Sequence, residues 1–421
     1  MGQQTAYRFQ WISRSNHPVK AIKRGYQAPP AGFDTGLFEA KFELSPFGEP
    51  IETIAWYDRN TQNIYIYSDA DEIYLSENAK AMFKDVTEDR DPIDIDLTGI
   101  NLSKAKDLSD FFARTKINHL NLGDFNLESA ENLSNMFYGT KFVNPDSTTV
   151  DLTKFNTSRA TNFSRMFAES NLTAINLTGL DTSAATNLFG MFQGMSGITS
   201  LDLTPLDTRN VTDMSSLFDR MTSLTKLNIS SLNTSQVTNM SSMFSGLSEL
   251  TDLDLSHLDT SQVTNMSSML SGLGKITSLN LSHFNTSSVE YMNDMFMNTS
   301  GLTNFNLSSF DTSNVKNMNS MFEGALADNA ILDLSSFNTS NVGTNTGSNE
   351  GMKNMFLNSK VKTIYASSAF NTSHIDEHEE LFGGNDNLVG GNGTAYSDSN
   401  PTTKAYAIID IAGTPGYFTQ K

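Results

Sequence analysis

Two histidine pairs are the residues of this 421-residue chain whose type and spacing could support metal chemistry. His374 and His378 stand four positions apart within HIDEHEE, a spacing that puts two side chains on one face of a helix. We interpret this segment as a solvated acidic turn, because compositional clusters of His and Glu are common false positives. His257 and His283 occupy equivalent positions of neighbouring repeats, but no third ligand is evident, so we expect no metal there either.

The motifs of the common enzyme classes are absent from the sequence. There is no G-x-S-x-G, H-E-x-x-H, phosphate-binding loop or dinucleotide fingerprint. With no cysteine, the chain has no thiol nucleophile, zinc–thiolate site or disulfide. Its aspartates recur at equivalent positions of a repeat, which suits structure better than a single glycosidase cleft. We therefore expect no catalytic residues, no cofactor and no metal.

Charge is unevenly distributed along the chain. The net charge of −19 disfavours a nucleic-acid partner, because an acidic surface repels phosphates. Residues 1–30 contain no acidic residue, and their basic residues are Arg8, Arg14, Lys20, Lys23 and Arg24. Two interpretations of this basic arm stay open: it docks on an acidic partner, or it packs on the chain's own first coils.

Internal repetition predicts the fold. An L-x-L core recurs about every 26 residues, with its second apolar residue at Leu97, Leu122, Leu152, Leu177, Leu203, Ile229, Leu255, Leu281, Leu307 and Leu334. Strand-like alternation places these side chains inward. The following V-T-x-M-S-S-[ML]-F segment has the apolar spacing of one helical face. The prediction is an α/β repeat solenoid, a right-handed leucine-rich-repeat-like array with a parallel β-sheet on one face and short helices or helical turns on the other.

The domain boundaries follow from where the repeat begins and ends. We expect a basic amino-terminal arm over 1–50, a β-rich cap over 51–90 and the solenoid of about 10–11 repeats over 91–382. Residues 383–421 are expected to form a mobile loop, over 383–403, followed by a closing β-hairpin.

Two columns of polar residues accompany the repeat. The central residue of L-x-L is always Asp or Asn and should point outward, so we take as candidate binding residues Asp202, Asn228, Asp254, Asn280 and Asn306. A second column, in [DN]-T-S, includes Asp259 and Asn285, and we expect it to cap the helical segments. Calcium binding is the weaker interpretation, because neutral asparagines interrupt both columns.

The [DN]TSxVTxMxxMF repeat resembles that of the BspA-like leucine-rich-repeat surface proteins of bacteria. The resemblance extends to IYIYSDADEIYLSENAKAMF before the first repeats and to NLVGGNGTAYSDSNPTTKAYAIIDIAGTPGYFTQK at the end, so it covers roughly residues 51–421. It implies display on a bacterial cell surface and adhesion to host or neighbouring-cell molecules. It defines no set of binding residues.

Three functions remain open: a surface adhesion protein, a virion appendage such as a tail or head fibre, and a structural spacer in a larger surface protein. The start of the chain lacks an apolar signal-peptide core, and no apolar run approaches the ~18 residues of a membrane span. We expect an extracellular location, on a bacterial surface or on a virion. The expected partner is a protein or glycan on a cell surface, bound by the outward sheet face rather than by a deep pocket.

Overall fold

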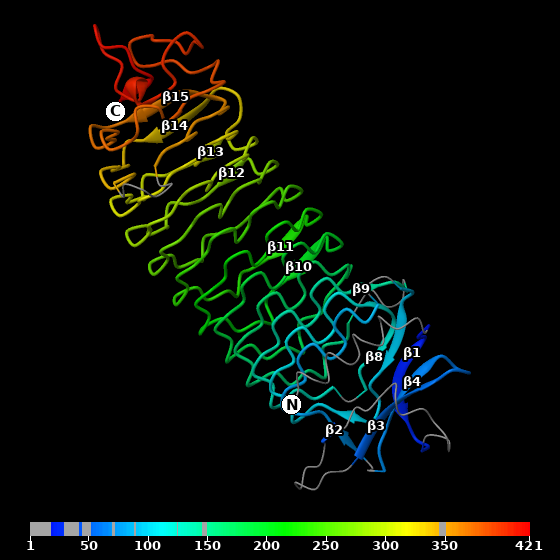
Figure 1. Cartoon of the computed structure of the whole chain (residues 1–421). Coiled ribbons are helices and arrows are strands. Elements are labelled where there is room, and N and C mark those ends of the chain that lie inside the picture. The colour runs from blue at the N-terminus through cyan, green and yellow to red at the C-terminus, as the bar shows by residue number, and fades with distance from the viewer. Residues whose placement is uncertain are drawn as a thin grey trace. The chain divides into compact units, whose positions relative to one another are not determined.

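The computed structural model describes residues 18–28, 42–43, 52–69, 72–87, 90–123, 125–144, 150–344 and 351–421. The chain forms two compact units, Met1–Asn210 and Val211–Lys421. Successive coils of the chain make up each unit (Figure 1), and within a unit each coil hydrogen-bonds to the next through its backbone. This arrangement satisfies backbone groups between coils, as the repeat predicts.

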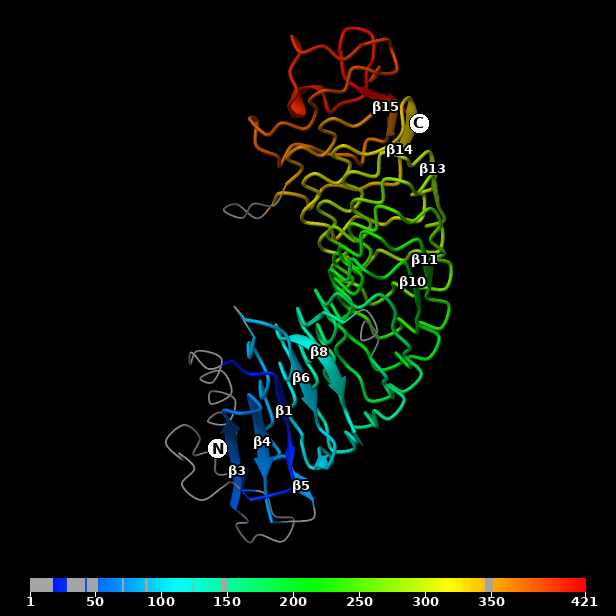
Figure 2. The ribbon, with the colours of Figure 1, turned by 90° about the vertical axis from the view of Figure 1, so that its right-hand side faces the viewer.

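A sheet of short strands opens the first unit. Its strand order is β2 (Phe42–Glu43), β3 (Glu52–Asp58), β4 (Asn63–Tyr67), β1 (Ala21–Gly25), β6 (Ile93–Asp96), β8 (Lys116–Asn121) and β9 (Lys141–Phe142). β2, β3 and β4 pair antiparallel, and the remaining neighbours pair parallel. β1, which comes from the basic arm, lies between β4 and β6 (Figure 2).

Stacking in the first unit begins upstream of Asp91, where the sequence placed the start of the repeats. β5 (Ile73–Tyr74) pairs parallel with β7 (Ile100–Asn101). The amide of Phe83 donates to the carbonyl of Phe111 at 2.8 Å. Residues 72–87 are therefore already a coil. β10 (Ser200–Asp202) is the last strand of this unit.

The second unit carries β11 (Lys226–Asn228), the parallel pair β12 (Ser278–Leu279) and β13 (Asn304–Phe305), and a sheet of β14 (Ala330–Leu334), β15 (Val361–Ala366) and β16 (Phe418–Gln420). At the expected closing hairpin, β16 pairs parallel with β15 and extends the sheet, Ile409 bridges Phe418 in parallel, and an antiparallel bridge joins Ile411 to Thr414. The segment expected to be a mobile loop contacts the end of the chain. The buried carboxylate of Asp410 accepts hydrogen bonds from the amides of Asn392 at 2.8 Å and Thr394 at 3.0 Å.

The core consists of the leucine, methionine and phenylalanine side chains that the repeat predicts to be inside. Phe244 is fully buried, which confirms its assignment to the core. Phenylalanines of successive coils stack, with ring centroids 5.2–6.1 Å apart, at Phe83, Phe112, Phe137, Phe167 and Phe192 in the first unit. Offset aromatic pairs at such distances add stabilisation beyond the burial of their area.

The predicted short helices are not seen. Among the described residues, the helical element is the 3-10 turn η3 (Lys404–Tyr406). In the coil of Phe244, the amides of Ser242 and Phe244 donate to the carbonyls of Ser267 and Met269 in the next coil, at 2.8 and 3.0 Å. The amides of Met243 and Ser245 donate instead three residues back, to Met240 and Ser242. Half of these amides thus donate to carbonyls outside the segment, so consecutive β-turns replace the helix.

Left-handed residues make these turns possible. Each such segment has two residues with positive φ, four positions apart, as at Ser242 (φ 55°) and Gly246 (φ 71°). The same pairs occur at Asp110 and Arg114, Asn135 and Gly139, Arg165 and Glu169, Gly190 and Gly194, Ser268 and Gly272, and Ser320 and Gly324. An α-helix does not accommodate positive φ, so the apolar spacing of three and four residues here reflects turns.

Candidate binding face

The five candidate binding residues are all exposed, and each closes a turn in its own coil. A side-chain oxygen of each accepts a hydrogen bond from the amide two residues later, at 2.9–3.3 Å, in a local turn typical of Asp and Asn. These residues are Asp202, Asn228, Asp254, Asn280 and Asn306. Their side chains therefore have a structural role in addition to any role in binding.

The strand register and the charge of Asp254 determine which polar groups this face presents to a ligand. Ser278 pairs with Asn304 and Leu279 with Phe305. Asn280 and Asn306 are the residues that directly follow these two paired strands. The side-chain and backbone hydrogen bonds of Ser256 lower the pKa of Asp254. Asp254 is consequently ionised at neutral pH, and the face presents fixed carboxylate and amide groups to solvent.

The [DN]-T-S column serves turns and links coils. The amides of Ser261 and Ser287 donate to Asp259 and Asn285 at 2.9 and 3.1 Å, so these residues close turns rather than cap helices. The middle threonine of each motif is buried, and its hydroxyl donates to the backbone carbonyl of the Asp or Asn in the next coil. These threonines are Thr157, Thr182, Thr234, Thr260, Thr286, Thr312 and Thr339.

A third column of Asp and Asn was missed in the sequence. It lies in V-T-[ND]-M, where Asn239 pairs with Asn265 and Asn265 with Tyr291 in parallel backbone bridges. The amides of Ser241 and Ser267 donate to the Asn239 and Asn265 side chains at 3.1 and 2.9 Å. Because the apolar spacing of this stretch predicts a helix, the sequence does not reveal that its repeated Asn residues form a strand-like column.

The histidines do not gather into a ligand set. His374 and His378 are exposed in a turn, so the helical-face argument for that pair does not apply. His283 meets the ring of Phe284 edge-on at 5.1 Å. Throughout the described part of the chain, no group of three or more His, Asp or Glu side chains could hold a metal ion.

The basic arm is partly incorporated into the first sheet. The guanidinium of Arg24 donates to the carbonyl of Gly99 at 2.8 Å, and the amide of Lys20 donates to Gln62 at 2.8 Å. The ammonium of Lys23 lies 5.3 Å from the centre of the Tyr65 ring. These contacts are those of a strand packed on its own unit, while Arg8 and Arg14 lie outside the described residues.

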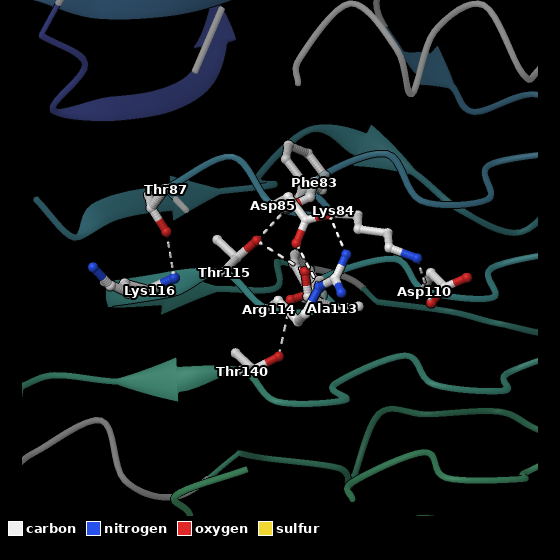
Figure 3. A network of polar contacts seen from close by, with 11 residues as sticks. Phe83, Lys84, Asp85, Thr87, Asp110, Ala113, Arg114, Thr115, Lys116 and Thr140 are labelled. Atoms are coloured by element: carbon white, nitrogen blue, oxygen red, sulfur yellow. Dashed lines mark hydrogen bonds and ion pairs between the residues drawn. The ribbon is translucent and has the colours of Figure 1, made fainter. Parts of the chain in front are cut away.

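A charged network joins the first coils (Figure 3). Arg114 makes a two-pronged ion pair with Asp85, at 2.6 and 2.7 Å, and Lys84 pairs with Asp110 at 3.0 Å. Buried Thr115 donates to the carbonyl of Phe83 in the preceding coil. Bidentate pairs of this kind fix geometry as well as charge, so the network serves to hold coils together.

Comparison with known proteins identifies the family at the level of the repeat. Among the described residues, no helix is both long and apolar enough to cross a membrane. The comparison with curated proteins finds no match. The chain is similar to a leucine-rich repeat protein from Eubacterium ventriosum of known crystal structure, at 12% identity over 75% of this chain and 86% of that one, with a TM-score of 0.23.

One family matches three times in succession, over residues 77–201, 186–278 and 273–392. Those matches span most of the stacked coils and support the resemblance to BspA-like repeat proteins. The chain thus belongs to the family described as Mycoplasma protein of unknown function, DUF285.

Proposed function

We propose that the chain is a non-enzymatic binding scaffold, displayed on a cell surface, that recognises host or neighbouring-cell molecules through the outward face of its strands. The observation that carries this proposal is the exposed column of Asp and Asn at Asn228, Asp254, Asn280 and Asn306. A backbone amide donates to the side-chain oxygen of each of them and holds the side chain in place, so little side-chain entropy is lost when a ligand binds.

Affinity at this column should be modest. Short polar side chains supply donors and acceptors, whereas aromatic and arginine anchors usually dominate binding energy. Useful strength would come from many copies of the protein on one surface. The partner expected is therefore a repeated protein or glycan epitope on another cell.

The test replaces Asn228, Asp254 and Asn280 together with lysine and measures adhesion in a multivalent cell-binding assay. The proposal predicts a clear loss of binding with an unchanged circular dichroism spectrum. Gln236→Lys, Gln262→Lys and Ser288→Lys form the control, since these residues are exposed on the same coils outside the column. Equal binding by both variants and the unaltered protein would refute the proposal.

A further inference from the structure

One row of residues crosses the first sheet from its aromatic side to the stacked coils. Trp56 of β3 is opposite Tyr65 of β4, and Tyr65 is opposite Lys23 of β1. Lys23 is opposite Asp96 of β6, and Asp96 is opposite Asn121 of β8. The inward neighbours of this row, among them Ile22, Ile64 and Ile95, are buried, whereas every member of the row is partly or fully exposed. We call Trp56, Tyr65, Lys23, Asp96 and Asn121 the Trp56 row.

The aromatic end of the Trp56 row is rigidly held. The Trp56 and Tyr65 rings stack at 5.1 Å between centroids, and the Lys23 ammonium lies 5.3 Å from the centre of the Tyr65 ring. The side-chain amide of Asn63 donates to the Tyr65 hydroxyl at 3.3 Å. A planar ring supported in this way is a low-entropy contact surface of the type that dominates binding sites.

The polar end of the sheet offers directed hydrogen bonds. One oxygen of Asp94 accepts from Asn118 at 2.9 Å and contacts Nδ1 of His119 at 2.8 Å. Both Asn118 and His119 reach Asp94 because the pairing of β6 with β8 is interrupted by a register shift between Ile93 and Ile95. Such irregularities commonly redirect side chains at functional sites. With Asp96 and Asn121, these groups supply both donors and acceptors for hydroxyl groups.

The charges around the row are nearly balanced. The row itself holds one ammonium group, that of Lys23, opposite one carboxylate, that of Asp96, within a protein of net charge −19. This balance gives no attraction for a polyanion such as heparin, nor a strong one for a polycation. From β3 to β8 the row spans roughly 19 Å at the usual spacing of strands.

We propose that the Trp56 row is a binding site for a neutral oligosaccharide chain of a cell-surface glycan. A sugar ring packs its C–H face on Trp56, and the hydroxyl groups of the following sugars donate to Asp96 and accept from Asn121. The proposal rests on the proposed binding role and deepens it, because it adds an aromatic anchor and a ligand class that the Asp/Asn column lacks.

The experiment uses the full chain with Trp11→Phe, so that Trp56 is its single tryptophan. Hexasaccharides of β-1,4-glucose, α-1,4-glucose, β-1,4-N-acetylglucosamine and α-mannose are titrated up to millimolar concentration, with a heparin hexasaccharide as the anionic probe. We expect at least one neutral probe to bind, with a change in Trp56 fluorescence and a matching calorimetric signal, and heparin not to bind.

Two variants separate the planar face from simple apolar volume. Trp56→Leu should weaken calorimetric binding at least about tenfold, whereas Trp56→Phe, which keeps a ring, should lose less. Thermal unfolding checks that both variants fold. The inference is overturned if no neutral probe binds, if heparin alone binds, or if Trp56→Leu binds as the unaltered chain does.

The lysine variant of Asn228, Asp254 and Asn280 distinguishes this inference from the proposed function. It should bind the neutral probe normally, because it leaves the Trp56 row intact. If that variant loses cell adhesion while no sugar binds any form of the protein, the proposed function stands and the glycan site fails. If sugar binding is present but adhesion is unaffected by the lysines, the Trp56 row survives and the column is not the recognition surface.

Discussion

The hydroxyl of Thr260 makes two hydrogen bonds to the backbone of one residue, Asn285, in the following coil. It donates to the Asn285 carbonyl at 3.0 Å and accepts from the Asn285 amide at 2.8 Å. Thr260 is only 2% exposed, so its hydroxyl is shielded from water. A single buried side chain therefore joins two coils.

Thr260→Val should lower the free energy of unfolding by about 1–3 kcal/mol, because it removes two hydrogen bonds between coils, each of which contributes about 0.5–1.5 kcal/mol. Thr260→Ser keeps the hydroxyl and should cost less. Urea denaturation measures both. A valine variant as stable as the original protein would show that the link between coils contributes nothing.

Phe244→Ala should destabilise the protein by about 3–5 kcal/mol, since it removes a fully buried ring. The ring of Phe244 also stacks on Phe218 at 5.6 Å. The next coil has Leu270 at the equivalent position, so Phe244→Leu should be tolerated better than alanine. Equal losses for alanine and leucine in thermal unfolding would contradict this account of the stack.

Gly272→Ala should cost about 1–2 kcal/mol, the usual penalty of a left-handed conformation for a residue with Cβ. Gly272 has φ 73°, and an added Cβ would lie 3.2 Å from the Cα of Gly246 in the preceding coil. Gly274→Ala is the matched control, because its nearest neighbour would be Ser300 Oγ at 3.9 Å. The prediction fails if both variants unfold at the same temperature.

Asp410 should make stability depend on pH on the acid side. Burial raises its pKa, but hydrogen bonds from Thr394, Asn392 and Gly416 outweigh burial, and the net effect is a lowered pKa. A lowered pKa contributes stability above the unfolded value of about 3.9, and this stability is lost as pH falls through the folded pKa. Asp410→Asn should therefore be less stable at neutral pH, with a difference that shrinks in acid. A difference independent of pH, in melting curves from neutral to acid, would rule out this role.

Deleting residues 1–30 should lower thermal stability, because the deletion removes β1, the strand that pairs with both β4 and β6. It also removes the side chain of Ile22, which is fully buried, from the core of this sheet. Stability that is unchanged while cell-surface display is lost would support the docking interpretation of the basic arm instead.

The sequence was most informative where burial alone decides. Leu203, Met243 and Phe244 are buried as their periodicity requires. The same periodicity could not distinguish a helix from consecutive β-turns, since both bring residues three and four apart to one side. A helix and consecutive β-turns differ in which carbonyls accept hydrogen bonds from their amides. The Ser242 amide donates to a carbonyl of the next coil, and the apolar pattern of the sequence does not reveal this bond.

The candidate sites show the same limit. The exposure of Asp254 and Asn280 followed from strand alternation, but their turn-closing bonds depend on side-chain torsions that alternation does not specify. The Trp56 row was missed because β1 has no repeat signature and pairs with β4 and β6 from a distant part of the chain. Only strand order brings Lys23 beside Tyr65.

The hydrogen bonds between coils also determine how the gene for a repeat protein of this kind can change in length. The run TSQVTNMSSM occurs at residues 234–243 and again at 260–269, so unequal recombination between the two copies adds or removes 26 residues. That segment is one full coil. The Thr234 hydroxyl would then meet the backbone of Asn285 instead of Asp259, with the same bonding groups in the same places. Length in this family can therefore vary in whole coils during evolution, and the distance between the ends of a unit can change without a new core having to be selected.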